Sequence, residues 1–263
     1  MKEVASEVLH KIRLFDVGRS DIPGPELFWM QDFDRWYELC FQVALLTGPE
    51  STILVNTGPA EDLTSMNEGW KTFLGERAAM RARPGMFVLD QLREAGIDPG
   101  EVTHVVLTPL QLYTISNLLA FPNAEICISR RGWDHFHSGR AVLHDTRSTS
   151  IPNHILAPLV TTERGRVRLL DEEDEIVPGV RSWWSGVHHR ASLNLDVDTA
   201  DGIVALSDSY FWLQNVERDH PIGICENLEE AFVTHERVRR TADVIVPLLD
   251  PANFDRHPGG RIG

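Results

Sequence analysis

Short runs of apolar residues dominate the two ends of the chain, and apolar residues at helical spacing lie between them. Runs of this kind, rich in Val, Ile and Leu and bounded by Gly, Pro, Asn or Asp, are typical of β-strands. Residues 48–51 and 201–202 have the composition of tight turns and join neighbouring strands. We predict strands over residues 8–17, 40–46, 52–56, 103–108, 125–129, 166–170, 175–177, 180–185, 192–198, 203–206 and 244–246.

Apolar residues that recur every three to four positions mark the helical segments. The segment 86–95 has this spacing and is followed by Gly96. Glycine commonly terminates helices because it adopts the left-handed conformation easily. Asn227 is followed three residues later by Glu230, which is the form of a capping box at a helix start. We predict helices over residues 62–80, 86–95 and 227–241, and two further helices that begin near Gln111 and Arg130.

The predicted elements follow one another as strands, then alternating strands and helices, then strands again. A chain with this order buries its apolar faces best as two packed sheets with helices on the outside. We find no internal repeat, low-complexity tract or linker, so the sequence predicts a single domain over residues 1–263. The expected fold is α/β, a four-layer αββα sandwich.

Charge and hydrophobicity restrict the partners of such a domain. The 25 basic and 39 acidic residues leave a net charge of −14, and no run of Lys and Arg offers the basic stripe that a phosphate backbone requires. No apolar run approaches the roughly 20 residues of a membrane span, and the N-terminal segment mixes charged and apolar residues too often for a signal peptide. We therefore expect a soluble, cytoplasmic protein that binds neither nucleic acid nor membrane.

The three cysteines offer no covalent framework. Cys40, Cys127 and Cys225 are isolated, odd in number and without the C-x-x-C spacing of redox or metal sites. We expect them to be reduced and buried.

Four stretches of the sequence carry distinctive phrases in a defined order. They are ILVNTG (residues 53–58), VTHVVLTPLQLYTISNLLAFPNAEI (102–126), WWSGVHHRASLNLDVDTADGIVALSDSYF (183–211) and IVPLLDPANFDRHPGGRIG (245–263). In this order they resemble the metallo-β-lactamase superfamily, and within it the hydrolases similar to N-acyl-homoserine lactonases. The resemblance covers nearly the whole chain. It implies the αββα sandwich, with an active site for two zinc ions at one edge.

The positions that hold metal in that family are altered in this chain. The resemblance implies that the residues matching His188 and Asp208 bind metal in the family, the aspartate bridging both ions. The other ligand positions carry Pro109, Gln111, Tyr113, Thr114 and Leu249, and Asn56 replaces an aspartate that orients the ligand loop. Proline and leucine side chains cannot ligate zinc, and neutral glutamine and tyrosine are poor donors. We predict no functional metal site and no cofactor.

Loss of the metal ligands leaves two functions from different classes open. The first is a catalytically inactive protein whose fold serves as a small-molecule-binding or interaction module. The second is a metal-independent enzyme built in the old cleft. The vacated positions favour the enzyme, because Gln111, Tyr113 and Thr114 can form hydrogen bonds, whereas collapse of a buried site favours apolar residues.

Without a shared ion, we expect His188 and Asp208 to contact each other directly. A carboxylate beside an imidazole stabilises the charged ring and fixes its orientation, which makes His188 the candidate general base. Tyr113, from the opposite loop, is the candidate proton donor or oxyanion partner. The candidate substrate-binding residues are Gln111, Thr114, His189 and Arg190.

The reaction class follows from the resemblance alone. It implies hydrolysis or ring opening of a small ester, lactone or amide, although a histidine base and a phenol acid suit a lyase or isomerase equally well. For His189 and Arg190, the alternative is that both are solvated residues of a loop.

An aromatic segment near the N-terminus has three alternative roles. It can line an apolar pocket, belong to the core, or form a subunit contact, and the last would make the protein a homodimer. The segment contains Phe28, Trp29, Met30, Phe33, Trp36 and Tyr37.

Overall fold

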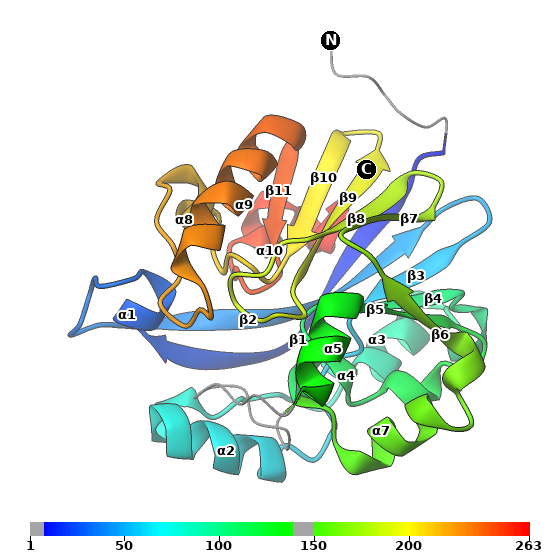
Figure 1. Cartoon of the computed structure of the whole chain (residues 1–263), viewed down its shortest axis with the longest axis horizontal. Coiled ribbons are helices and arrows are strands. Elements are labelled where there is room, and N and C mark those ends of the chain that lie inside the picture. The colour runs from blue at the N-terminus through cyan, green and yellow to red at the C-terminus, as the bar shows by residue number, and fades with distance from the viewer. Residues whose placement is uncertain (1–7, 139–149) are drawn as a thin grey trace.

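In the computed structural model, which describes residues 8–138 and 150–263, two β-sheets pack face to face with helices on their outer sides (Figure 1). The described residues form a seven-stranded sheet in the order β12-β1-β2-β3-β4-β5-β6 and a five-stranded sheet in the order β11-β10-β9-β8-β7. Both are mixed, since β3 to β6 run parallel, as do β10 and β11, whereas the other neighbours are antiparallel.

The strands have the following bounds. The larger sheet contains β1 (Lys11–Pro23), β2 (Trp36–Thr47), β3 (Thr52–Val55), β4 (His104–Leu107), β5 (Glu125–Ser129), β6 (Val167–Leu170) and β12 (Arg261–Ile262). The smaller sheet contains β7 (Glu173–Val177), β8 (Val180–Trp184), β9 (Leu193–Thr199), β10 (Gly202–Ser207) and β11 (Val244–Pro247).

The helices cover the two outer faces. Figure 1 shows α3, α4, α5 and α7 beside the larger sheet and α8 and α9 beside the smaller one. Their bounds are α1 (Gly24–Leu27), α2 (Thr64–Leu74), α3 (Val88–Ala95), α4 (Leu112–Ile115), α5 (Arg130–His137), α7 (Asn153–Val160), α8 (Leu213–Glu217), α9 (Leu228–Thr241) and α10 (Asn253–Arg256).

Alternation along the strands separates the core into layers. In β4, Val106 packs between the two sheets, whereas Val105 and Leu107 pack under the helices of the larger sheet. In β10, Val204 belongs to the layer between the sheets, and Ala205 packs against α8 and α9. Successive side chains of a strand point to opposite faces, so sheets covered on both sides need apolar residues at every position. The four-layer prediction is confirmed.

Several predicted boundaries differ from those observed. The first strand continues past a bulge between Asp16 and Gly18 to Pro23 and forms a long hairpin with β2. The helix predicted over residues 62–80 ends at Leu74, because Gly75 takes a left-handed φ of 92°. The helix predicted from Gln111 is the short element α4.

The N-terminus of α9 is capped on one side only. The Asn227 side chain accepts hydrogen bonds from the backbone N–H groups of Glu229 and Glu230, as the pattern predicts. The reciprocal bond of a capping box is not formed, because the Glu230 carboxylate binds Arg190 and the backbone N–H of Val187 instead. These contacts of Glu230 connect α9 to the loop between β8 and β9.

The aromatic segment lies away from the cavity described below. Phe28 and Tyr37 pack edge to face with each other and with Trp212, so this part belongs to the core. Trp29 and Phe33 are exposed, and no residue of the segment lines the cavity. The segment therefore has no role in lining this cavity, and a homodimer through this surface stays a prediction.

Within residues 8–138 and 150–263, no helix is long and apolar enough to cross a bilayer. Cys40 and Cys127 are buried free thiols, and burial raises the pKa of both. Cys225 is also free but only partly buried.

Candidate active site

Three segments distant in sequence meet at one edge of the sandwich. Thr108 directly follows β4, His188 lies in the loop between β8 and β9, and Asp208 directly follows β10. Thr108 and Asp208 are 100 positions apart in the chain, yet the Thr108 hydroxyl donates a hydrogen bond to the Asp208 carboxylate. Strand ends that converge in this way are a common origin of active sites, because the sheets hold the loops rigidly.

A cavity of about 590 Å³ opens at this edge, between β2, α2 and the loops after β4 and β8. Its large apolar residues include Leu39, Phe41, Trp70, Phe73, Phe211 and Leu249. Two facing loops also contribute the polar side chains of Gln111, Tyr113, His188 and His189, and further polar residues line the cavity from β1 and α2, namely Ser20, Asp21, Ser65, Glu68 and Thr72. This size and lining suit a small molecule with an apolar part and one polar group.

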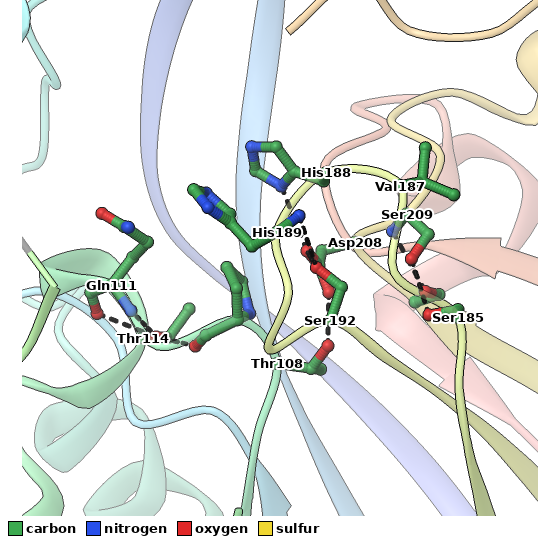
Figure 2. A network of polar contacts seen from close by, with 12 residues as sticks. Thr108, Gln111, Thr114, Ser185, Val187, His188, His189, Ser192, Asp208 and Ser209 are labelled. Atoms are coloured by element: carbon green, nitrogen blue, oxygen red, sulfur yellow. Dashed lines mark hydrogen bonds and ion pairs between the residues drawn. The ribbon is translucent and has the colours of Figure 1, made fainter. Parts of the chain in front are cut away.

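His188 and Asp208 form a direct pair (Figure 2). Nδ1 of His188 lies 3.1 Å from Oδ2 of Asp208, and both side chains are almost fully buried. The Asp208 carboxylate also accepts hydrogen bonds from the hydroxyls of Thr108 and of Ser192, the latter at 2.6 Å. These donors stabilise a buried negative charge and fix the carboxylate in position. The expected contact between His188 and Asp208 is present.

The backbone before His188 is strained. Val187 has a φ of 65°, which is unusual for a β-branched residue, and Gly186 has a φ of 60°. The Val187 N–H donates to the Glu230 carboxylate at 3.0 Å, and the His188 N–H donates to the Gly186 carbonyl at 2.9 Å. Strain of this kind persists where the surroundings over-determine a conformation, and it is common at functional sites.

His189 and Arg190 are not solvated loop residues. The His189 side chain is 5% exposed, and Nδ1 lies 3.7 Å from Oε1 of Glu226. Arg190 forms ion pairs with Glu226 and Glu230, both at 2.6 Å, and does not line the cavity. The structure therefore brings His189 to the cavity and places Arg190 behind it.

In the loop after β4, which carries the altered metal positions, some side chains line the cavity and others are buried in the interior. The Tyr113 ring packs against Phe41 and Trp70, with centroid distances of 5.0 and 5.8 Å. Gln111 also lines the cavity, but Thr114 does not. The Thr114 hydroxyl binds the carbonyls of Pro109 and Gln111 within the loop, and the side chain is buried. The structure thus departs from the expectation that Thr114 contacts substrate.

Asn56 keeps a supporting position in this region. Its side chain accepts a hydrogen bond from the Thr108 N–H at 2.8 Å and donates one to the Thr108 carbonyl at 2.9 Å. Both donor and acceptor are needed for this pair of bonds, and an ionised aspartate would supply only acceptors. Asn56 therefore holds the backbone of Thr108, at the start of the loop after β4, through both bonds.

The donor set does not fit a pair of zinc ions. The described part of the chain contains no group of three His, Cys, Asp or Glu side chains placed to hold a metal. The side chains of Pro109 and Leu249 contain no atom that can bind a metal. The Asp208 oxygens already accept hydrogen bonds from the hydroxyls of Thr108 and Ser192. We therefore derive no chemical step through a metal.

Sequence reasoning missed three residues of this site. Thr108 and Ser192 hold Asp208, and Glu226 faces His189. Thr108 stands just before the first vacated metal position, which is a local signal. Glu226 lies 36 positions after Arg190 and has no sequence pattern that links the two.

The comparisons with known proteins bear on the fold. A quorum-quenching N-acyl homoserine lactone lactonase matches with a TM-score of 0.72 and 18% identity, over 96% of this chain and 95% of that one. An N-acyl homoserine lactone hydrolase with N-hexanoyl-L-homoserine at its catalytic metal center matches with a TM-score of 0.76 and 19% identity, over 94% and 95%. A hydrolase of the beta-lactamase superfamily matches with a TM-score of 0.62 and 15% identity, over 99% and 93%.

No protein-family model and no curated protein sequence matches the chain. The structural matches show that it has the metallo-β-lactamase fold over nearly its full length, as the resemblance implied. At these identities, they carry the fold and leave the chemistry to the residues of the cavity.

Proposed function

We propose that the chain is a metal-independent hydrolase that cleaves or ring-opens a small ester, lactone or amide. The observation that carries the proposal is the buried Asp208–His188 pair, 3.1 Å apart, with His188 on the wall of the cavity. A histidine oriented by a buried carboxylate is the usual form of a positioned general base. The metallo-β-lactamase fold supports the reaction class by analogy, because the solved structures that share it include lactone hydrolases.

The reaction begins with His188. A carboxylate only accepts hydrogen bonds, so the proton between Asp208 and His188 belongs to Nδ1, and the neutral ring has its lone pair on Nε2. Nε2 takes a proton from water while the water oxygen attacks the substrate carbonyl carbon. Tyr113 stabilises the negative charge that develops on the carbonyl oxygen. The bond to the leaving oxygen or nitrogen then breaks, and that atom takes up a proton.

The apolar wall favours a substrate with a hydrocarbon part. Phe41, Trp70 and Phe73 present aromatic surface to the cavity, and burial of apolar area contributes about 25 cal/mol per Å². Gln111 lines the same cavity and can hydrogen-bond a carbonyl or amide group. A medium-length acyl ester, lactone or amide combines both features.

The second candidate is a small-molecule-binding module without turnover. The extent of the apolar wall favours it, because such a surface binds a ligand whether or not His188 acts as a base. Binding of hexanoate with no hydrolysis of any hexanoyl derivative would support this alternative.

The experiment compares purified wild-type protein with His188→Ala on p-nitrophenyl hexanoate, N-hexanoyl-homoserine lactone and N-ethylhexanamide. We expect kcat to fall by about 10²- to 10⁴-fold on every compound that the wild type hydrolyses. The matched control is His235→Ala, which alters a histidine away from the cavity and should leave kcat unchanged. Equal turnover by His188→Ala and wild type would contradict the proposal.

A further inference from the structure

His189 lies beside His188 and has a carboxylate partner of its own. The centroids of the two rings are 4.0 Å apart, and their planes are inclined by 50°. Figure 2 shows the two rings side by side on one loop, facing the loop that carries Gln111. Nδ1 of His189 lies 3.7 Å from Oε1 of Glu226. The cavity thus has two histidine–carboxylate pairs, of which the proposed reaction uses only one.

Glu226 is nearly as buried as Asp208, but its carboxylate accepts fewer hydrogen bonds. Its side chain is 4% exposed, and its backbone N–H donates to the Val187 carbonyl at 2.7 Å. The two carboxylate oxygens have different partners, since Oε2 accepts from Nε of Arg190 at 2.6 Å and Oε1 faces His189. Arg190 also binds the Glu230 carboxylate through two hydrogen bonds of 2.6 and 2.9 Å.

The charge of Glu226 follows from these contacts. Burial by itself would raise its pKa, but the contacts with His189 and Arg190 outweigh burial and hold the pKa below its ordinary value. Glu226 is therefore ionised at neutral pH. An ionised carboxylate with so little exposure needs compensating positive charge close by.

Counting only residues 8–138 and 150–263, this cluster lacks one positive charge unless His189 supplies it. Arg190 compensates one of the two carboxylates of Glu226 and Glu230. Asp208 is itself negative and supplies no positive charge. Its own charge is stabilised by three hydrogen bonds. Two cationic rings 4.0 Å apart would repel each other, so the two are not charged together. Asp208 already accepts hydrogen bonds from two hydroxyls, whereas Oε1 of Glu226 faces His189, and this difference favours the additional proton on the ring beside Glu226.

We infer that Glu226 is a positioning residue that holds His189 as the proton donor to the leaving atom of the substrate, beside His188 as the base. The inference rests on the proposed function and deepens it. Proton donation matters most where the leaving oxygen is strongly basic, as in an alkyl ester or a lactone, and least for an activated aryl ester. The structure thus points to unactivated alkyl esters or lactones as the substrate class.

The proton transfers balance over one turnover. His188 removes a proton from the attacking water, and the carbon–oxygen bond to the leaving group breaks. His189 gives its Nε2 proton to that oxygen, which leaves as an alcohol or as the hydroxyl of an opened lactone. The proton gained by His188 then returns to His189 through solvent, and the net change is ester plus water to acid plus alcohol.

The test uses two esters that share an acyl group and differ in the leaving group, ethyl hexanoate and p-nitrophenyl hexanoate. We expect His189→Gln and Glu226→Gln to lower kcat on ethyl hexanoate by about 10²-fold, and on p-nitrophenyl hexanoate by no more than about 5-fold, with KM little changed. Glu226→Asp should restore part of the loss. The matched control, Asp219→Asn, removes a carboxylate from the histidine pair outside the cavity and should change neither rate.

The outcomes separate this inference from the proposed function. If His189→Gln and Glu226→Gln lower both rates equally, or neither rate, the inference is wrong although His188 still acts as base. If His188→Ala keeps wild-type turnover, or if the wild type hydrolyses neither ester, the proposed function fails and the inference falls with it. Should Glu226→Gln not fold, His189→Gln alone decides, because it leaves the Arg190–Glu226 ion pair in place.

Discussion

Two histidine–aspartate pairs of nearly equal geometry lie in different parts of the molecule. His188 is 3.1 Å from Asp208, and His235 is 3.2 Å from Asp219. Both imidazoles are buried, but the carboxylates differ, since the Asp208 side chain is 2% exposed and the Asp219 side chain 44%. Asp219 also binds Arg239 at 3.1 Å and faces solvent.

The difference shows what turns such a contact into a candidate site. His235 is on α9, does not line the cavity, and has its pKa lowered by burial to about 4, so it is neutral at pH 7. His188 lines the cavity, and its partner is fixed by two hydroxyl donors. The contact itself is common to both pairs. Of the two pairs, only the first has a buried carboxylate with hydroxyl donors and a histidine on the cavity wall.

Asp208→Asn is expected to have the largest effect on turnover. The neutral amide can still accept a hydrogen bond from Nδ1, but it has no negative charge and can also present its NH2 group, so the ring is less firmly oriented and its cationic form loses stabilisation. We expect kcat on p-nitrophenyl hexanoate to fall by about 10²- to 10⁴-fold with an unchanged unfolding midpoint. Asp219→Asn is the control. Equal rates for Asp208→Asn and the control would show that the two pairs do not differ in function.

A smaller effect is expected for Ser192→Ala, which removes one donor from Asp208. The carboxylate keeps its bond from Thr108 and its contact with His188, but its orientation is less fixed. We expect kcat to fall by about 10-fold on p-nitrophenyl hexanoate, with KM unchanged. Combining Ser192→Ala with Asp208→Asn should add no further loss. Independent losses in the double variant would show that Ser192 acts by another route.

Tyr113→Phe is expected to have a smaller effect than either of these changes. The ring still packs on Phe41 and Trp70, so only the hydroxyl is lost. If it stabilises the oxyanion among other polar groups, kcat falls by less than about 10-fold. A loss as large as that of His188→Ala would instead make Tyr113 a principal catalytic group.

The pair outside the cavity should affect stability and leave activity unchanged. Burial holds the pKa of His235 at about 4, against an opposing contribution from Asp219, whereas the unfolded chain titrates near 6.5. The unfolded chain therefore takes up a proton that the folded chain excludes, so stability falls as pH drops from 6.5 and levels off below about 4.

We expect the free energy of unfolding in urea to fall less between pH 7 and pH 4 in His235→Gln than in the wild type. The difference should be about 3 kcal/mol at most. The other histidines remain in both proteins and cancel. An identical pH dependence in the two proteins would contradict the assignment.

Local patterns predicted much of the fold. The order of strands and helices indicated two packed sheets with helices outside, and Asn227 indicated the start of α9. The ends of elements were less predictable, because the conformation of Gly75 ends α2 before its amphipathic pattern ends. Strand propensity also gave no sign that the first hairpin would continue through a bulge.

The candidate site was predictable only where the resemblance aligned it. His188 and Asp208 lie together as expected, and Gln111 and Tyr113 reach the cavity. Thr114 does not reach it, because its hydroxyl satisfies carbonyl groups of its own loop. Partners such as Glu226 depend on contacts between distant segments, which local sequence patterns do not encode.

The central claim is that the buried Asp208–His188 pair works without a metal ion. The most direct measurement is the rate of p-nitrophenyl hexanoate hydrolysis, before and after dialysis against EDTA, by protein whose metal content is known. We expect less than about 0.1 zinc or iron per chain, and neither the rate nor the melting temperature should change after chelation. One or more tightly bound metal ions per chain, with activity lost on removal and restored on addition, would contradict the account.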